Sequence, residues 1–440
     1  MGVDTSAVLP SRTVSLSAEE DRMTTNELVS VEKSSYRLVN APSGTVFTCW
    51  TALSKTMIGT GMLALAYGFS KCGWVLGFVL LILSGVGACF TLHLLNILAM
   101  RSSTRHVSFF TIAEACAPWS RWIVDVAIAV KCIGVGISYI QVSGDTISHV
   151  IGVWSNHAPD DTLRRAMVVL AVLVLAAPVC FARSISKTVI VNVLGLLAIT
   201  YVVVLAVALT DYNSGVVTRW DLPPTASFSS VLSVVPTFIF AFTCHQNILL
   251  CAEDMKDRSQ RKLDVVAFAS EAAALVLFIP AIIFPYLDFG ENTRSNVVLD
   301  YDVEHNIAVQ VGYLFLGIAE AAAYPLQLFP ARKSLLVLLT RAQPVSPKAE
   351  FRFRIVLTTS ILILTAGIAV SVRSLGVTLS FVGIIGSNTI CFIMPTFFYC
   401  VTMHKADVKK GPKWVLSAVV FLMTVALLPI CLSAVVISLL

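Results

Sequence analysis

Long apolar runs, separated by short polar stretches, recur along almost the whole of this chain. About eleven of them reach or approach ~20 residues, the length that a helix needs to cross ~30 Å of hydrocarbon. Backbone groups in lipid must be hydrogen-bonded within their own segment, and the alternating ten-residue pattern of a membrane barrel is missing, so each run predicts a helix. The expected spans are 45–71, 74–100, 122–150, 166–182, 188–210, 229–250, 263–287, 306–329, 353–371, 376–402 and 414–439.

Composition agrees with a membrane protein and excludes several soluble classes. Of the 440 residues, 57% are hydrophobic and only 13% are charged, against about 25% in an ordinary soluble domain. A soluble enzyme, a disordered regulator and a nucleic-acid-binding protein all need more charge. The 11 Cys are scattered and the 7 His lack metal-ligand spacing, so we expect no disulfide framework, no metal site and no cofactor.

Basic residues are divided unevenly between alternate loops. If the polar tail 1–44 is cytosolic, most of the 31 Lys and Arg lie in that tail and in loops on the same side. Because basic loops are retained on the cytosolic side, we expect a cytosolic N-terminus and an outer C-terminus. The outer loops then hold only Lys71, Arg164, Arg165, Arg219, Arg294 and Arg373.

The first span is interrupted by glycine near its middle. Gly59 and Gly61 flank Thr60, and each glycine costs about 1 kcal/mol in a helix interior. Local unwinding would leave free N–H groups at the start of a half-helix, where a carboxylate binds well. Close helix packing by small residues is the alternative explanation.

The sixth span contains a second interruption, in the string FAFTCHQN at 240–247, where four of the last five residues can form hydrogen bonds. Breaks in spans one and six are what an inverted repeat of five helices predicts. We therefore expect an all-α polytopic membrane protein in which 45–439 is the transporter domain. Its parts would be a first repeat over about 45–210, a second over about 229–402 and an extra helix over about 414–439.

These strings resemble the amino acid/auxin permease family, a branch of the amino acid–polyamine–organocation superfamily. The resemblance covers spans one to ten, and the helix-six string is most similar to fungal and protist vacuolar-type members. The family consists of eleven-helix transporters that carry amino acids across plasma or vacuolar membranes, driven by protons or sodium. The strings that carry the resemblance are IGTGMLAL (58–65), GVGISY (134–139), FAFTCHQN (240–247) and LFPAR (328–332).

The resemblance implies where an amino acid binds. Its α-carboxylate should meet the N–H groups over 59–61, and its α-amino group should meet carbonyls around Ile58 and Thr243. Tyr139 would point at the site from the third span. The expected substrate-binding residues are Ile58, Gly59, Thr60, Gly61, Tyr139, Phe240, Thr243, Cys244, His245 and Glu320.

One departure from the family concerns the coupling ion. Sodium-coupled members have Asn where this chain has Lys55, and a hydroxyl residue near the position of Ala321 to Ala323. A sodium site needs oxygen ligands, and an ammonium group repels a second cation. We therefore predict that the Lys55 ammonium takes the place of sodium and ties helix one to helix eight. Snorkelling of Lys55 to the interface is the alternative.

Other ionisable residues inside the spans are costly to bury and are candidates for function. Glu320 could pair with the Lys55 ammonium, and that ion pair could serve coupling or be purely structural. Alternatively, Glu320 could bind the cationic side chain of a substrate. Lys131 is expected to be structural, paired with Asp125 or with carbonyl groups of a neighbouring helix. Glu271 is a weaker candidate for a proton site. His245 can change charge near neutral pH, although most buried histidines only pack.

These features predict a secondary active transporter of neutral or cationic L-amino acids that works by alternating access. We expect coupling to protons rather than sodium, although facilitative transport also fits. The partners would be amino acids, protons and the bilayer, without nucleic acid, in a plasma membrane or a vacuole-like or lysosome-like membrane. The rival is an amino acid sensor that signals through the tail 1–44. An enzyme is not expected, because the spans lack paired carboxylates and a nucleophile–base motif.

Overall fold

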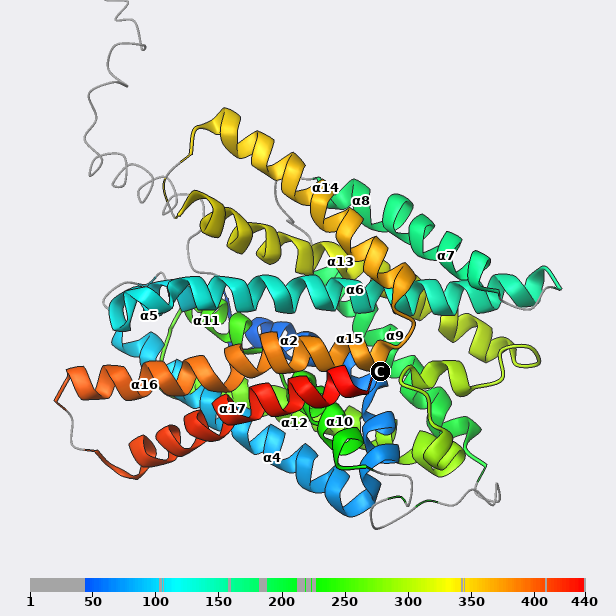
Figure 1. The fold of residues 1–440 in the computed structure, drawn as a ribbon, viewed down its shortest axis with the longest axis horizontal. Coiled ribbons are helices and arrows are strands. Elements are labelled where there is room, and N and C mark those ends of the chain that lie inside the picture. Colours follow the sequence, from blue (N-terminus) through cyan, green and yellow to red (C-terminus); the bar gives the residue numbers. More distant parts are fainter. Residues whose placement is uncertain are drawn as a thin grey trace, which may run out of the picture. The chain divides into compact units, whose positions relative to one another are not determined.

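The computed structural model is an assembly of helices, most of which run back and forth along a shared direction (Figure 1). It describes residues 44–438, except 103–104, 106, 157–159, 182–187, 212–217, 219–222, 224–226, 342, 344 and 408–409. Within these residues the structure is helical, apart from an isolated bridge between Gly44 and Met255. The tail expected over 1–44 lies almost entirely outside the described residues, so its role stays a prediction.

The helices account for the predicted spans. Short π-helical turns over Ala171–Ala176, Val382–Ser387 and Thr389–Ile393 continue two of the spans without a loop. In chain order the α-helices are α2 (Val46–Met57), α3 (Thr60–Leu63), α4 (Leu65–Arg101), α5 (Phe109–Cys116), α6 (Arg121–Trp154), α7 (Asp161–Leu170), α8 (Ala177–Cys180), α9 (Thr188–Leu209), α10 (Phe228–Ala241), α11 (His245–Asp254), α12 (Gln260–Phe289), α13 (Ile307–Thr340), α14 (Pro347–Ser371), α15 (Leu375–Phe381), α16 (Met394–Lys405) and α17 (Pro412–Ile437).

Eleven spans are present in the described part of the chain, as predicted. Ten helical segments there are long and apolar enough to cross a membrane. The other span is the first, which is split into α2, α3 and the first turns of α4. Gly73 separates it from the second span, with a φ of 70° that favours glycine. The predicted boundary between spans one and two is therefore confirmed.

One helix extends well beyond its predicted end. The eighth span was expected to end near residue 329, but α13 continues to Thr340. Pro325 and Pro330 lie inside it and do not stop it. Proline removes one backbone donor and bends a helix, and neighbouring helices can still hold such a helix together in a membrane protein. Arg332 and Lys333 interrupt the apolar run after Pro330, so hydropathy ended the span there and missed the apolar turns from Leu335 to Leu339.

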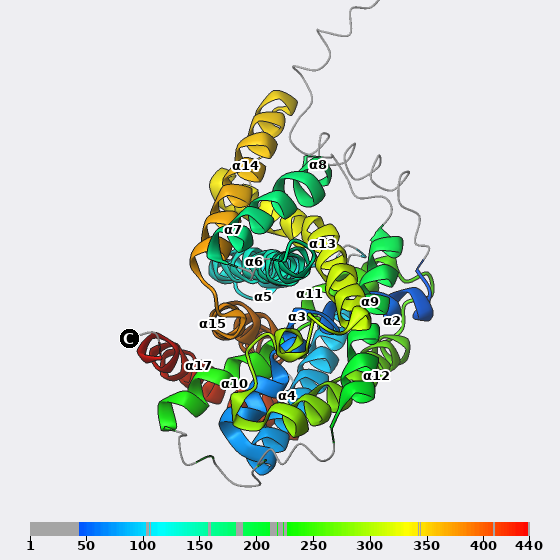
Figure 2. The ribbon, with the colours of Figure 1, turned by 90° about the vertical axis from the view of Figure 1, so that its right-hand side faces the viewer.

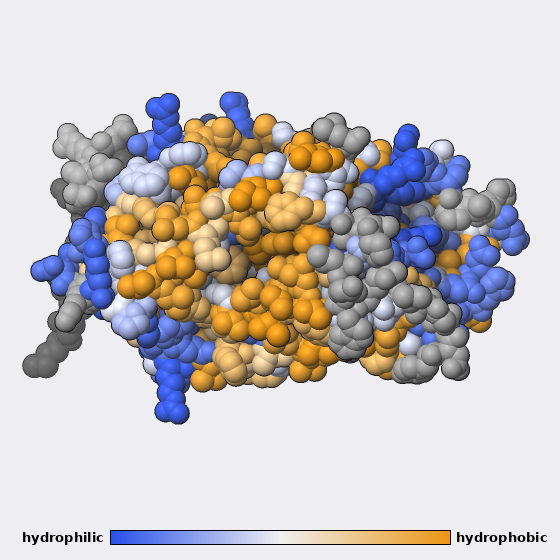
Figure 3. Space-filling model, turned by 60° about the horizontal axis from the view of Figure 1, so that its bottom comes forward, coloured by the Kyte–Doolittle hydropathy of each residue, from blue (hydrophilic) through white to orange (hydrophobic). Residues whose placement is uncertain are grey.

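Apolar side chains cover the middle of the helical unit, and hydrophilic side chains gather toward its two ends (Figure 3). Phe268, Val276 and Leu422 are 70%, 70% and 66% exposed. An apolar belt of this extent would be costly in water and is favourable against lipid. Only 22% of the most apolar stretch of α17 is buried, as expected for an added helix that faces lipid on most sides.

The long helices α6 and α13 pack along each other and carry the wall beside the broken spans (Figure 2). Small residues permit the close approach: a Cβ atom on Gly136 would lie 2.9 Å from the Tyr324 ring. The same pairing places Tyr139 of α6 and Glu320 of α13 in the interior. This helix pair therefore positions side chains that the sequence assigned to the binding site.

Candidate substrate-binding site

The first span leaves helical geometry at two residues. Ile58 has φ −80° and ψ 87°, and Gly59 has φ −155° and ψ −154°. The helix resumes at Thr60, so the N–H groups of Thr60 and Gly61 stand at the start of a half-helix. Neither has a hydrogen-bond acceptor among the described residues. Free donors at the positive end of a helix can bind a carboxylate.

The sixth span is also broken, as predicted. α10 ends at Ala241 and α11 begins at His245, and the residues between them are not helical. Thr243 donates its N–H to the Phe240 carbonyl over 3.0 Å. Its hydroxyl donates to the Ile239 carbonyl over 3.1 Å. The Thr243 side chain therefore stabilises the break, and its own carbonyl remains an acceptor.

The two breaks lie against each other, and the two glycines have different surroundings. A Cβ atom on Gly61 would lie 2.7 Å from Cδ1 of Phe240 and 3.5 Å from Cα of Ala241. Only glycine permits that contact. A Cβ atom on Gly59 would meet only the Tyr139 hydroxyl, at 3.9 Å. Close packing therefore explains Gly61, and Gly59 borders open space.

Helix α6 forms the wall that faces the first break. The Oγ1 atom of Thr60 lies 2.9 Å from Oγ of Ser138. Because Ser138 donates its own proton to the Val135 carbonyl over 2.8 Å, Thr60 is the donor between the two hydroxyls. The Thr60 side chain is thus held by α6, while its backbone N–H stays free. Tyr139, the next residue, is 6% exposed.

Gln327 of α13 belongs to this wall, although the sequence patterns did not single it out. Its Nε2 lies 3.5 Å from the Tyr139 hydroxyl oxygen. The signal that could have found it is an amide side chain between Pro325 and Pro330 in an apolar span. Gln327 and Tyr139 together place polar groups beside the space at Gly59.

Lys55 and Glu320 meet beside the first break. The Lys55 Nζ lies 4.0 Å from Oε1 of Glu320, and it donates to the Ile58 carbonyl over 3.3 Å. The two side chains are 5% and 1% exposed, so Lys55 is buried in the protein and does not snorkel out of it. A Cβ atom on Gly195 of α9 would lie 2.6 Å from Cε of Lys55. Glycine at that position therefore makes room for the lysine.

The Glu320 carboxyl group retains unused bonding capacity. Neither oxygen has a hydrogen-bond partner within the described ranges, and the contact to Lys55 is long for an ion pair. An ionised carboxylate can accept about four hydrogen bonds. Glu320 can therefore take up a proton, a shorter contact to the lysine or a cationic group of a ligand.

His245 is directed toward α4. Its Nε2 lies 2.9 Å from Oγ1 of Thr91. The Thr91 hydroxyl donates to carbonyls at Gly87 and Ala88 over 3.0 and 3.1 Å, so the histidine donates from Nε2. Its Nδ1 is then an acceptor, and that atom has no partner in the part of the chain that the structure describes. Cys244, the preceding residue, is fully buried.

Of the two partners expected for Lys131, the Asp125 alternative is wrong. No ion pair joins them among the described side chains. They lie six positions apart on α6, whereas partners on one helix face are three or four apart. Lys131 is 2% exposed and packs close to Gly386: a Cβ atom added to Gly386 would lie 2.7 Å from the Cβ of Lys131.

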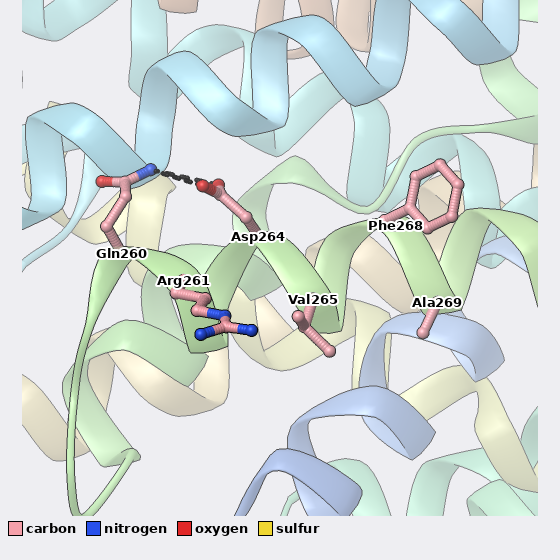
Figure 4. Close-up of a pocket in the computed structure, with 6 residues that line it drawn as sticks. All are labelled: Gln260, Arg261, Asp264, Val265, Phe268 and Ala269. Carbon is pink, nitrogen blue, oxygen red and sulfur yellow. Dashed lines mark hydrogen bonds between the residues drawn. The ribbon is translucent and has the colours of Figure 1, made fainter.

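An open hollow of about 560 Å³ lies along the N-terminal turns of α12, away from the breaks (Figure 4). It is a surface feature of a single helix. Within it, Gln260 donates to both Asp264 oxygens over 3.0 Å. Among the described residues, no group of three or more His, Cys, Asp or Glu is placed to hold a metal ion. The lining residues of the hollow are Gln260, Arg261, Asp264, Val265, Phe268 and Ala269.

Several known proteins resemble this chain over most of its length. "Vacuolar amino acid transporter 5" of Schizosaccharomyces pombe is 29% identical over 356 residues, which cover 80% of this chain and 83% of that protein. "Vacuolar amino acid transporter 6" of Saccharomyces cerevisiae is 27% identical over 394 residues, with 79% and 87% covered. "Sodium-coupled neutral amino acid transporter 4" of Mus musculus is 28% identical over only 192 residues, with 43% and 34% covered.

The fold and the family are both established by comparison. The crystal structure of MhsT in complex with L-phenylalanine superimposes with a TM-score of 0.54 at 14% identity, covering 88% of this chain and 98% of that one. At this identity the likeness concerns the fold alone. A family model described as "Transmembrane amino acid transporter protein" matches residues 42–438. The chain, with its two broken spans, therefore belongs to the family of transmembrane amino acid transporter proteins.

Proposed function

We propose that this protein moves L-amino acids across a membrane by alternating access, coupled to protons and not to sodium. The meeting of the two broken spans carries the proposal, because it combines free N–H groups, the carbonyls of Ile58 and Thr243 and space beside Gly59. A zwitterion needs both kinds of partner close together. Relatives named as vacuolar amino acid transporters support the same substrate class.

The backbone of the breaks would recognise the part that all amino acids share. The α-carboxylate would accept hydrogen bonds from the N–H groups of Thr60 and Gly61, at the positive end of a half-helix. Each such bond to a charged group contributes about 1.5–3 kcal/mol. The α-ammonium group would donate to the carbonyls of Ile58 and Thr243. The ring of Tyr139 would then cover the bound backbone.

Lys55 and Glu320 are the proposed coupling pair. The Lys55 ammonium already donates to the Ile58 carbonyl over 3.3 Å, which is the acceptor that a substrate ammonium would use. Two cations repel each other at one carbonyl, so Lys55 must move toward Glu320, 4.0 Å away, when substrate arrives. The protonation state of the pair thus controls whether the carbonyl is available, which links proton binding to substrate binding.

Sodium coupling fits these surroundings poorly. The eighth span, α13, has Ala321 and Ala323 next to Glu320, and both are buried and lack a side-chain oxygen that could bind sodium. The Lys55 ammonium stands where a cation would need to bind. The sodium-coupled relative aligns with 43% of this chain, so its name is weak support for sodium here.

We place the protein in a vacuole-like or lysosome-like membrane, with a plasma membrane as the alternative, and its N-terminus in the cytosol. Gly44 donates its N–H to the Asp254 carbonyl over 3.0 Å, and Lys256 donates to the Gly44 carbonyl over 2.9 Å. The start of span one and the loop after span six are therefore on one side. That loop is basic, which favours the cytosolic side.

Uptake by purified protein in liposomes tests the proposal. Labelled arginine and a labelled neutral amino acid would be offered with and without a proton gradient, in sodium and in sodium-free buffer. We expect accumulation that requires the proton gradient, disappears with a protonophore and is indifferent to sodium. Uptake that follows sodium and ignores pH would refute the coupling. Binding without any uptake would refute transport and favour a sensor.

A further inference from the structure

Glu271 of α12 is a buried carboxyl group without a partner. It is 3% exposed, and neither oxygen has a hydrogen-bond partner among the described residues. It lies about 17 Å along α12 from the first residue of that helix. The neighbouring turn is held against α2, because Trp50 donates to the Ala269 carbonyl over 3.2 Å and Ser270 donates to the Trp50 carbonyl over 3.3 Å. The position of Glu271 is therefore well determined by packing.

The same helix contains a second carboxylate, Asp264, that does have hydrogen-bond and ion-pair partners. Asp264 lies two turns earlier, and its carboxylate has three partners. His93 Nδ1 lies at 3.1 Å, and Asn96 Nδ2 and Gln260 Nε2 donate hydrogen bonds over 2.9 and 3.0 Å. Glu271 has none of these partners. The contrast indicates that Glu271 is not held as a structural ion pair.

The groups around Glu271 come from the break in helix six and its neighbours. The Glu271 carboxyl group interacts electrostatically with three thiols. They belong to Cys89 of α4, Cys244 directly before α11 and Cys391 in the turn Thr389–Ile393. On α2, Cys49 contacts Cys251 and Lys55 contacts Glu320, so neither serves Glu271. Among described residues, the ionisable side chains on the neighbouring elements are Tyr67, Lys71, Cys72, Cys89, His93 and Arg101 on α4, Cys49 and Lys55 on α2, Tyr201 on α9, His245, Cys251, Glu253 and Asp254 on α11, Cys244 directly before α11 and Cys391 in the turn, with Lys131 of α6 near the last two.

An ionised carboxylate in this position would be unstable. Removing a charged group from water costs several kcal/mol unless a counter-ion and hydrogen bonds replace the water. No described basic side chain makes an ion pair with Glu271. The neutral acid loses far less on burial. Glu271 therefore carries a proton in this conformation.

We infer that Glu271 is a second proton-binding site of the transport cycle, separate from the Lys55–Glu320 pair and placed behind the break of helix six. When α11 moves away from α12, water reaches the carboxyl group, its O–H bond breaks and the proton passes to that water, which leaves a hydrated carboxylate. The return movement removes the water and requires the group to take up a proton again. The inference rests on the proposed proton-coupled transport.

His245 gives the site a second unsatisfied atom. Its Nδ1 is a buried acceptor without a described partner, and its Nε2 is fixed on Thr91. Thr91 and Cys89 lie two residues apart on α4, so the histidine and the carboxyl group approach neighbouring positions of that helix from different faces. A protonated carboxyl group needs such an acceptor for its O–H as α11 moves.

The test compares Glu271→Gln with wild type in liposomes and in infrared spectra. Glutamine keeps the size and the neutral state but cannot release a proton. Each proton carried per substrate raises the accumulation that a gradient of one pH unit supports by about tenfold. We expect the ratio of proton-driven accumulation to substrate exchange to fall about tenfold in Glu271→Gln, with loss of a carbonyl stretching band of a protonated carboxyl group. Glu114→Gln, at a surface carboxylate paired with Arg121, is the matched control and should match wild type in both measurements.

Different failures are distinguishable. Wild-type accumulation by Glu271→Gln, or an unchanged infrared band, would overturn the assignment and leave proton-coupled transport standing. A wild-type protein that exchanges substrate but ignores the proton gradient would overturn the proposed coupling and this inference with it. If Glu271→Gln does not fold, Glu271→Asp should accumulate substrate with a displaced pH profile. A profile identical to wild type in that variant would contradict the role.

Discussion

Two glycines separated by one residue have different functions in the first span. Gly61 lies against Phe240, where a Cβ atom would come within 2.7 Å of the ring. Gly59 borders open space beside the Tyr139 hydroxyl. A short Gly-x-Gly string therefore contains one packing residue and one residue beside the proposed binding space, and substitution can separate the two.

Gly59→Ala is expected to fold normally and to lose transport. The added methyl group meets no atom closer than 3.9 Å, and the negative φ of Gly59 suits alanine. It would occupy the space of the substrate carboxylate, and loss of one charge-assisted hydrogen bond of about 1.5–3 kcal/mol weakens binding by about ten- to a hundredfold. Binding by scintillation proximity and melting in detergent would measure the two effects.

Gly61→Ala provides the contrast. Its methyl group would overlap the Phe240 ring, and overpacking costs about 1–3 kcal/mol. We expect a lower melting temperature than in Gly59→Ala. Equal melting temperatures for the two variants would contradict the division between packing and binding.

The buried pair of Lys55 and Glu320 gives a second prediction. Removal of one partner leaves an uncompensated charge and costs about 3–5 kcal/mol, so Lys55→Ala and Glu320→Ala should each lower the melting temperature. The double variant Lys55→Met with Glu320→Leu should recover most of the stability, because no charge remains buried, but it should not transport. Substrate exchange by the double variant would show that the pair is only structural.

At the scale of elements, the two half-helices α2 and α11 touch through cysteines. The Sγ of Cys49 lies 3.9 Å from the Cys251 carbonyl oxygen, and the Sγ of Cys251 lies 3.8 Å from the Cys49 carbonyl oxygen. α2 ends at the break of span one, and α11 begins at the break of span six. In the proposed alternating access, opening the binding site toward this side of the protein requires the two half-helices to separate.

A cross-link between these half-helices should therefore stop transport. In a variant that keeps only Cys49 and Cys251, mild oxidation is expected to join the two thiols and abolish uptake, and a reducing agent should restore it. The same treatment of a further Cys49→Ser variant should have no effect. Full uptake by cross-linked protein would mean that α2 and α11 move together.

The loop between α12 and α13 contains a pH-sensitive ion pair. Asp300 accepts the Arg294 N–H over 2.9 Å, and its carboxylate lies 3.3 Å from the Arg294 Nε. Burial raises the pKa of Asp300 to about 6, and Arg294 offsets only part of that effect. The folded loop binds the proton more tightly than the unfolded chain, so its stability falls as pH rises from about 4 to about 6.

Asp300→Asn should remove that pH dependence. At about pH 7.5 the variant loop should exchange its amide hydrogens more slowly than wild type, because the amide carries no buried charge. At about pH 5 the two should converge, since wild-type Asp300 is then mostly protonated. Hydrogen–deuterium exchange over residues 290–305 measures this. Faster exchange in the variant at both pH values would mean that the ion pair with Arg294 outweighs the cost of burial.

At the scale of the whole molecule, residues 44–440 form a unit with its own core. We expect deletion of residues 1–43 to leave folding and transport intact, because Gly44 already anchors the start of the unit through Asp254 and Lys256. Uptake and size-exclusion profiles of the truncated protein would check this. Loss of uptake by a well-folded truncated protein would assign the tail a part in transport.

Much of this architecture was predictable from the chain because lipid restricts the choices. A long apolar run in hydrocarbon can only be a helix, so eleven spans followed from hydropathy. Glycine and polar residues inside such runs are exceptions, so the strings around Gly59 and Thr243 located both breaks. The end of α13 was missed, because Pro330, Arg332 and Lys333 interrupt the apolar run before its last turns, which are apolar again.

The sequence by itself determined the membrane class, the number of spans and the two places where helices break, since each depends on local composition within one segment. Only the tertiary structure decided how helices are rotated against each other. That rotation pairs Lys55 with Glu320, divides Gly59 from Gly61 and leaves Glu271 alone. A side chain's partner depends on which face its helix presents to neighbours far away in the chain, and hydropathy contains no information on that.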